Sequence, residues 1–318
     1  MKLPIISLSL LATPAFAVVS IDYVTVGDAG NAADASGYGA VAYEYNIARN
    51  ETTVGQYAEF LNATAATDSY GLYSTDMASS TYLGSLITRS GSSGSYTYSV
   101  ASGRDNLPIA YVSWFDAARF VNWLHNGQGS GSTETGVYNL NGATSGIFTA
   151  QPGATVWLPT EDEWYKAAYY DPTKGGTGGY WLHANQSDTM TTNDPTVAGA
   201  ANYNDGDYVG SGTSSPPSGN ALTEVGAYGA DSQSYYGTND QGGNLFEWND
   251  AVISGSSRGL RGGSWGNPEG ALRSSNRASG APAYQYLSLG FRVASVPEPS
   301  CLVLTALASG VMLVCRRR

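Results

Sequence analysis

Cysteine is nearly absent from this sequence. There are two, Cys301 and Cys315, and both lie close to the C-terminus. Between Val18 and Val296 no side chain can form a disulfide or supply a thiolate, which is the form of cysteine that acts as a nucleophile and as a soft metal ligand. This part of the chain therefore excludes thiol chemistry, and its fold has to be held by a hydrophobic core or by bound metal.

Histidine and charged side chains are also scarce. The two histidines, His125 and His183, cannot make a zinc site without carboxylates. Charged residues are 13% of the chain, against about 25% in a typical globular protein, and the net charge is −11. We expect no nucleic-acid partner, because binding to nucleic acid requires a basic surface. The sequence instead has 40 glycines and 23 tyrosines, which is more consistent with cations, sugars or other proteins as ligands.

The first 17 residues have the pattern of a secretory signal peptide. Met1–Ala17 contains one lysine, an apolar stretch and the small-x-small ending Ala15-Phe16-Ala17. The apolar stretch is too short to span a bilayer, which takes about 20 residues. We expect signal peptidase to remove residues 1–17, so that the exported chain begins at Val18. The alternative is a buried N-terminal strand.

The C-terminal end has a three-part pattern. Val296–Pro299 precedes an apolar run from Cys301 to Cys315, and Arg316–Arg318 follow. The arginines are costly to carry across a membrane and should stay in the cytoplasm. The pattern resembles the PEP-CTERM sorting signal of Gram-negative bacteria. The resemblance implies that residues 296–318 anchor the chain transiently in the inner membrane until an exosortase removes them. It also implies release to the cell envelope or extracellular matrix, often in species that make exopolysaccharide.

Residues 18–295 have the composition of one large domain. Capping boxes or close variants begin at Thr53, Ser113 and Thr160, and apolar residues spaced for one helix face follow each of them. We predict three helices there. Short strands are predicted at 43–47, 96–100, 155–158, 259–262 and 290–294. The stretch 174–242 has almost no periodicity, and so long a loop needs something to order it, such as bound cations.

A glycine-rich motif joins two carboxylates. Asp240 and Glu247 flank Gly242-Gly243, which lets the backbone fold back between them. Calcium binds carboxylates together with main-chain carbonyls, and tight turns expose those carbonyls. The alternative is a glycine turn that leads into a buried aromatic strand, with Glu247 in a structural hydrogen bond. These residues alone leave both interpretations open.

A second motif, Gly262–Gly266, matches the nucleophile elbow G-x-S-x-G of serine hydrolases. That elbow requires a strand before it and a helix after it, with a histidine and an acid supplied from elsewhere. Here the residues that follow, Asn267–Gly270, form a turn signal. Hydrolase chemistry is therefore disfavoured.

Five ordered motifs carry a family resemblance. They are Pro108–Trp114, Trp157–Trp164, Gly243–Trp248, Arg261–Trp265 and Gly290–Ala294. In this order and spacing they resemble the formylglycine-generating enzyme, or sulfatase-modifying factor, family, and Asn50–Phe60 resembles the first helix of that family. The resemblance implies a single C-type-lectin-like domain of the α+β class, with three main helices, short strands and long loops.

The resemblance also implies calcium at two places. The first would use four positions of the glycine-rich motif: Asp240, Gly243, Leu245 and Glu247. A second, weaker site would begin at Asn202 and Tyr203, although its downstream aspartate has no clear counterpart in this sequence.

The sequence departs from the family at its catalytic positions. Active members use two cysteines after the Gly-Gly-Ser motif to bind copper and to oxidise a substrate cysteine to formylglycine. Matching through that motif puts those positions at Asn267 and Leu272, and neither side chain can form a thiolate. We therefore expect no catalytic residues, no copper and no oxidase activity.

Three hypotheses follow for function. The first is an exported binding module of the envelope, stabilised by calcium, with a glycan such as exopolysaccharide or a cell-surface protein as its ligand. The second is a structural matrix protein whose only ligand is calcium. The third is an enzyme, with formylglycine-generating oxidase or another activity. Its charged candidates near Asn267 are Arg261, Glu269, Arg273 and Arg277, which salt bridges would explain without catalysis.

Overall fold

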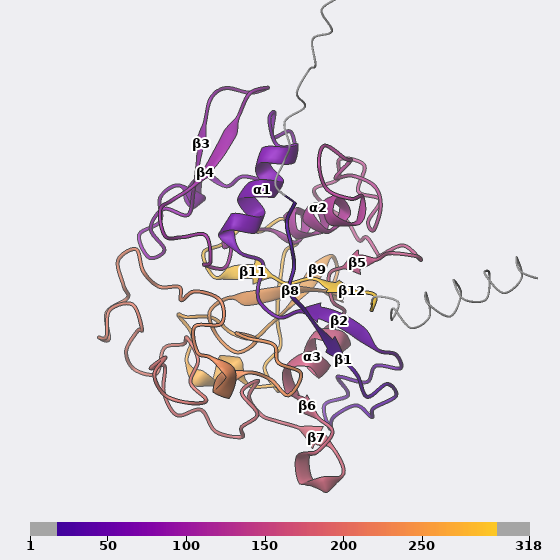
Figure 1. Ribbon diagram of the computed structural model, residues 1–318, viewed down its shortest axis with the longest axis vertical. Coiled ribbons are helices and arrows are strands. Elements are labelled where there is room, and N and C mark those ends of the chain that lie inside the picture. The colour runs from indigo at the N-terminus through magenta and orange to yellow at the C-terminus, as the bar shows by residue number, and fades with distance from the viewer. Residues whose placement is uncertain (1–17, 298–318) are drawn as a thin grey trace, which may run out of the picture.

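The computed structural model describes residues 18–297. The predicted signal peptide and nearly all of the predicted sorting segment lie outside these residues. Within them the chain folds into a mixed α+β structure. Figure 1 shows two small sheets in the middle, with α1 and α2 on one side of them in this view and α3 on the other.

The three α-helices begin where the capping boxes predict them. They are α1 (Val54–Thr64), α2 (Trp114–His125) and α3 (Glu161–Tyr169). In each, the N-cap hydroxyl accepts a hydrogen bond from the third backbone amide, and the third side chain accepts one from the N-cap amide. These reciprocal bonds satisfy amides that the helix cannot pair internally.

The first sheet joins the two ends of the domain. Its strands lie in the order β1 (Tyr23–Val26), β2 (Tyr45–Ala48), β12 (Ala294–Ser295) and β5 (Val156–Trp157). All of its pairings are antiparallel. Since β12 lies between β2 and β5, the last strand of the domain completes a sheet that the first strands begin.

The second sheet carries the glycine-rich motif. Its order is β10 (Ala278–Gly280), β9 (Ser257–Arg261), β8 (Phe246–Ser254) and β11 (Leu289–Phe291). β11 runs parallel to β8, whereas the other pairs are antiparallel. The single strand predicted at 290–294 was therefore wrong. The segment divides into β11 and β12, in different sheets, with the buried side chain of Arg292 between them.

The remaining regular elements are short. β3 (Ile87–Ser90) and β4 (Thr97–Val100) form an antiparallel hairpin, and β6 (Tyr170–Asp171) pairs with β7 (Gly179–Tyr180). Four 3-10 turns complete the list: η1 (Thr75–Met77), η2 (Lys174–Gly176), η3 (Ala230–Ser232) and η4 (Glu269–Leu272). Only η2, β7 and η3 fall in the aperiodic stretch 174–242.

An aromatic cluster holds α1 and α2 against the second sheet. The rings of Phe60 and Phe120 lie 5.4 Å apart edge to face, and Phe120 contacts Phe291 of β11 at the same distance. Trp123 packs on Phe60 at 5.4 Å. All four rings are fully buried. Such pairs stabilise a core beyond the effect of their buried area.

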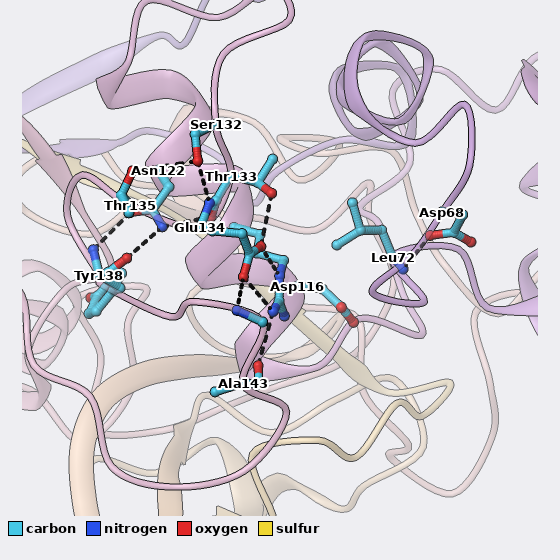
Figure 2. Close-up of polar contacts among 12 residues, drawn as sticks. Asp68, Leu72, Asp116, Asn122, Ser132, Thr133, Glu134, Thr135, Tyr138 and Ala143 are labelled. Carbon is cyan, nitrogen blue, oxygen red and sulfur yellow. Dashed lines mark hydrogen bonds and ion pairs between the residues drawn. The ribbon is translucent and has the colours of Figure 1, made fainter. Parts of the chain in front are cut away.

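Polar side chains of α2 hold the loop at 132–143. Asn122 donates to the carbonyls of Thr133 and Tyr138 and accepts from the Tyr138 amide (Figure 2). Glu134 of the loop pairs with Arg119 of the helix at 2.6 Å. A helix face thus replaces regular secondary structure as the support for this loop. No helix among residues 18–297 is long and apolar enough to cross a membrane.

Candidate functional site

The two segments predicted to bind calcium lie against each other. Asn244 N donates to Asn202 O at 2.8 Å, and Asn202 Nδ2 donates to Asn244 Oδ1 at 3.0 Å. A side chain at Gly243 would overlap the Asn202 carbonyl. The loop turns through positive φ at Asp240, Gly243 and Asn244. Asn202 and Asn244, which are roughly 40 positions apart in the chain, therefore lie in one site. Gly243 occupies the point where the two backbones come closest.

The carboxylate of Glu247 is fully buried and paired with Arg292. Arg292 Nε lies 2.7 Å from Oε2 and Nη2 lies 2.7 Å from Oε1, and Trp164 Nε1 donates to Oε2 at 2.8 Å. The guanidinium is therefore the counterion of this carboxylate. Glu247 thus lies in a buried strand and takes part in structural hydrogen bonds, as one of the two interpretations of the motif describes. The Leu245 side chain lies in the core.

Glu51 is a second buried carboxylate at this site, and it was not predicted from the sequence. Its Oε2 accepts from Asn244 Nδ2 at 3.0 Å and its Oε1 from Leu245 N at 3.2 Å. Burial raises the pKa of Glu51 well above its usual range, and the charges of Asp240 and Glu247 add to the effect. Its position at the start of the first-helix motif was the available signal, but that motif was used only to predict the helix.

Asp240 lies at the other end of the loop. Its Oδ2 accepts from Gly226 N at 2.7 Å. Burial raises the pKa of Asp240 to about 6. Its carboxylate faces a small cavity that also touches Asn185 and Ser232. Tyr203, of the weaker predicted site, packs in an apolar cluster with Leu272.

The positions matched to the catalytic cysteines have structural roles. Asn267 Oδ1 accepts from Ser264 Oγ at 2.6 Å and from Ser264 N at 3.1 Å, so it closes the turn after the Gly-Gly-Ser motif. Leu272 is fully buried and packs on Ala201 and Tyr203. The Ser264 hydroxyl thus donates to the side-chain amide of Asn267.

Arg261 and Arg277 share one buried partner. Glu161 Oε1 lies 2.7 Å from Arg261 Nη2, and its Oε2 lies 2.6 Å from Arg277 Nη2. These hydrogen-bonded guanidinium groups lower the pKa of Glu161, although burial opposes the shift. Arg261 has almost no exposed surface, so its salt bridge with Glu161 lies inside the protein.

Glu269 and Arg273 form a more exposed pair. They are bonded at 2.9 and 2.8 Å, and Glu269 also lies 2.8 Å from His183 Nε2. Burial lowers the pKa of His183. All four charged candidates near Asn267 are therefore engaged in ion pairs.

A groove of about 540 Å³ opens beside this region. It is lined by aromatic and acidic side chains, chiefly Tyr170, Tyr180, Trp181, Asp34 and Asp188, with Ser274 at one edge. Ser274 N donates to Leu182 O at 2.8 Å, which ties the groove to the segment that follows Leu272.

Neighbouring side chains hold the Trp181 indole and the carboxylates of the groove in position. Lys174 Nζ lies 3.9 Å from the Trp181 ring centroid and 2.8 Å from Asp188 Oδ1. Trp181 Nε1 donates to Asp171 at 3.0 Å. Asp34 accepts from Ser36 and from the Tyr165 hydroxyl. The indole and the carboxylates are thus held in place by neighbouring side chains.

Comparisons with known proteins agree with this fold. The family model described as the sulfatase-modifying factor enzyme 1-like domain matches residues 24–296. A Treponema denticola variable protein has 20% identity and a TM-score of 0.55, covering 89% of this chain and 98% of that one. A crystal structure of CarF has 20% identity and a TM-score of 0.50, covering 88% and 100%. PvdO from Pseudomonas aeruginosa has 19% identity and a TM-score of 0.46, covering 87% of this chain and 92% of that one.

No curated protein sequence matches significantly. The predicted α+β, C-type-lectin-like domain is confirmed.

Proposed function

This chain belongs to the family of sulfatase-modifying factor enzyme 1-like domains, and we propose that it is an exported, non-catalytic member that binds a saccharide of the cell envelope. The aromatic and acidic groove is the observation that carries the proposal. Its volume of about 540 Å³ lies within the range of about 300–1,000 Å³ found for small-ligand pockets.

The chemistry of the groove suits a sugar. Aromatic rings such as Tyr170 and Trp181 offer apolar surface to the C–H faces of a pyranose, while the carboxylates of Asp34 and Asp188 accept hydrogen bonds from hydroxyl groups. The carboxylates disfavour an anionic polysaccharide, because like charges repel. The favoured ligand is therefore a neutral or amino-substituted glycan, such as a host exopolysaccharide.

The proposal that the protein is not an oxidase rests on Asn267 and Leu272. The Asn267 carboxamide bonds within its own turn, and the Leu272 side chain fills an apolar cluster. Neither can bind copper as a thiolate does. A cysteine peptide of the sulfatase type, incubated with the protein and copper, should yield no aldehyde detectable by hydrazide labelling. Aldehyde formation would favour the alternative function, a formylglycine-generating oxidase.

The two chain ends support the cellular part of the proposal. A signal peptide over residues 1–17 and a sorting segment over 296–318 would require signal peptidase and exosortase as processing partners. The protein would then reach the envelope or extracellular matrix, where polysaccharide is available.

The direct test is binding of the purified protein to exopolysaccharide from its own host, by co-sedimentation. We expect Trp181→Ala to weaken binding at least about tenfold, since stacked aromatic anchors dominate such interfaces. Tyr284→Ala is the matched control, because Tyr284 is an exposed aromatic that does not line the groove. Equal binding by both variants, or no binding by the wild type, would contradict the proposal.

A further inference from the structure

The groove lined by Tyr170, Tyr180 and Trp181 carries charge of only one sign. Two of its lining side chains are charged, Asp34 and Asp188, and both are acidic. The other lining residues are aromatic, aliphatic or small, and none of them is cationic. A cationic group on a ligand would therefore meet carboxylates on the groove wall and no opposing positive charge.

Lys174 shows how an ammonium group is held next to this groove. Its Nζ lies 3.9 Å from the Trp181 ring centroid, and it donates to Asp188 Oδ1 and to Tyr180 O, each at 2.8 Å. An aromatic face, a carboxylate and a carbonyl thus surround one ammonium group, and each of them attracts a cation. The hydrogen bond from Lys174 also lowers the pKa of Asp188. The charge of Asp188 is therefore largely neutralised by Lys174.

Asp34 differs from Asp188 because its hydrogen-bond donors are neutral. Its Oδ1 accepts from Ser36 Oγ at 2.6 Å, and its Oδ2 accepts from the Tyr165 hydroxyl. Burial would raise the pKa of Asp34, but these hydrogen bonds outweigh that effect and lower the pKa, so the carboxylate stays ionised.

Asp34 also has no cationic partner. In the part of the chain that the structure describes, no lysine, arginine or histidine forms a salt bridge with it. The guanidinium of Arg261 lies 5.1 Å from the Tyr165 ring centroid, but it pairs with Glu161. Asp34 is thus the groove carboxylate whose charge is free to attract a ligand.

Building on the saccharide binding proposed above, we infer that the groove selects a glycan with free amino groups and that Asp34 binds the ammonium. The aromatic rings would contact the C–H faces of the sugar, while the Asp34 carboxylate accepts hydrogen bonds from the amino group. Such charge-assisted bonds are stronger than bonds between neutral groups. N-acetylation removes the positive charge, so the acetylated form of the same glycan should bind more weakly.

Lys174 is a specificity-determining residue in this arrangement. Because it neutralises Asp188, it leaves one carboxylate in the groove to attract an amine instead of two. Specificity is a difference between two affinities, and Lys174 sets part of that difference without a hydrogen bond to the sugar.

The test compares two ligands of equal length by isothermal titration calorimetry of the purified protein. The ligands are a hexamer of glucosamine and a hexamer of N-acetylglucosamine, at a slightly acidic pH that keeps the amino groups protonated. At low salt we expect the glucosamine hexamer to bind at least about tenfold more tightly. Added salt should reduce this ratio, because it screens charges. Equal affinities would overturn the inference and leave saccharide binding in place.

Two variants change the charge of the groove in opposite directions. Asp34→Asn should bring the affinity ratio close to one, since the amide keeps the shape of the side chain without its charge. Lys174→Met should raise the ratio, because it leaves Asp188 without a counterion. Damage to the fold would not produce such a gain, so this variant tests the inference even if Asp34→Asn does not fold by circular dichroism. A ratio that does not rise in Lys174→Met would overturn the role of Lys174.

Asp194→Asn is the matched control, because it removes an exposed carboxylate outside the groove. It should leave the ratio unchanged. An equal fall in Asp194→Asn and Asp34→Asn would mean that the overall negative charge attracts the amine, and it would overturn the site. Failure of both hexamers to bind would also overturn the inference. Co-sedimentation with host exopolysaccharide then decides separately whether the protein binds a saccharide.

Discussion

At the scale of single residues, the ion pair between Glu247 and Arg292 stands out because neither side chain has exposed surface. Glu247 also accepts from Trp164, while Arg292 donates to three backbone carbonyls, those of Ala48, Arg49 and Asn239. The pair and these bonds join β8 to the connection between β11 and β12 and to the end of β2. Removing one partner leaves the other charge buried and unpaired.

We therefore expect Glu247→Gln to lower the free energy of unfolding by about 3–5 kcal/mol. Urea denaturation followed by tryptophan fluorescence measures the change. Glu269→Gln is the control, since Glu269 pairs with a largely exposed arginine and should cause a much smaller loss. Similar losses in the two variants would show that burial does not determine the strength of these pairs here.

Asp116 provides a prediction about pH. It is the N3 residue of α2 and accepts from Ser113 and Gln285, and burial raises its pKa from 3.8 to about 6. Because the folded state binds this proton more tightly than the unfolded chain, the contribution of Asp116 is most stabilising below about pH 4. It is lost as the pH rises through about 6, by about 3 kcal/mol.

Asp116→Asn should remove this component. The difference in unfolding free energy between wild type and variant, measured by urea titration at several pH values from 4 to 7, should change by about 3 kcal/mol over that interval. Other carboxylates titrate in both proteins and cancel in the difference. A difference that stays constant with pH would mean that Asp116 has an ordinary pKa.

At the scale of elements, the contact between the loop before β8 and the Asn202 segment depends on one glycine. Gly243 has a φ of 97°, and a Cβ there would overlap the Asn202 backbone. Backbone cannot move aside as a flexible side chain can. The two segments are therefore held at a separation that only glycine allows.

Gly243→Ala should destabilise the fold by about 2–3 kcal/mol, through the positive φ and the forced separation of the two segments. Gly266→Ala is the control, because no atom lies within 4 Å of a Cβ there and its φ is not positive. Thermal unfolding of both variants is the measurement. An unchanged melting temperature for Gly243→Ala would show that the Asn202 segment can move away at little cost.

At the scale of the whole molecule, the first sheet brings the two ends of the domain together. β12 pairs with β2 and β5, so residues 294–295 are part of the fold and the proposed sorting segment begins directly after them. A cut after the sheet would leave every pairing of the domain intact. Processing at both ends is thus compatible with a complete folded body.

Mass spectrometry of the protein recovered from the host envelope tests the proposed processing. We expect a chain that begins at Val18 and lacks the apolar run from Cys301 to Cys315. Changing the three terminal arginines to alanine should retain the tail, because the basic stop would be lost. Recovery of the wild-type protein with its tail attached would contradict removal by an exosortase.

Local patterns predicted the helices and the broad fold well. Each capping box bonds residues three positions apart, so Thr53, Ser113 and Thr160 carry the information for α1, α2 and α3 within one turn. The absence of cysteine between Val18 and Val296 likewise excluded thiol chemistry from the sequence alone. The ordered motifs indicated the family, and the family match confirms it.

Tertiary structure alone decided what the polar residues do. The sequence did not indicate that Arg292, from a strand connection 45 residues away, would lie against Glu247. Glu51 joined the same site through contacts with residues nearly 200 positions away. The partner of a buried charge depends on which distant segments of the chain pack against it. Local hydrogen bonding and hydrophobic periodicity involve only residues close in sequence, so they cannot predict that partner.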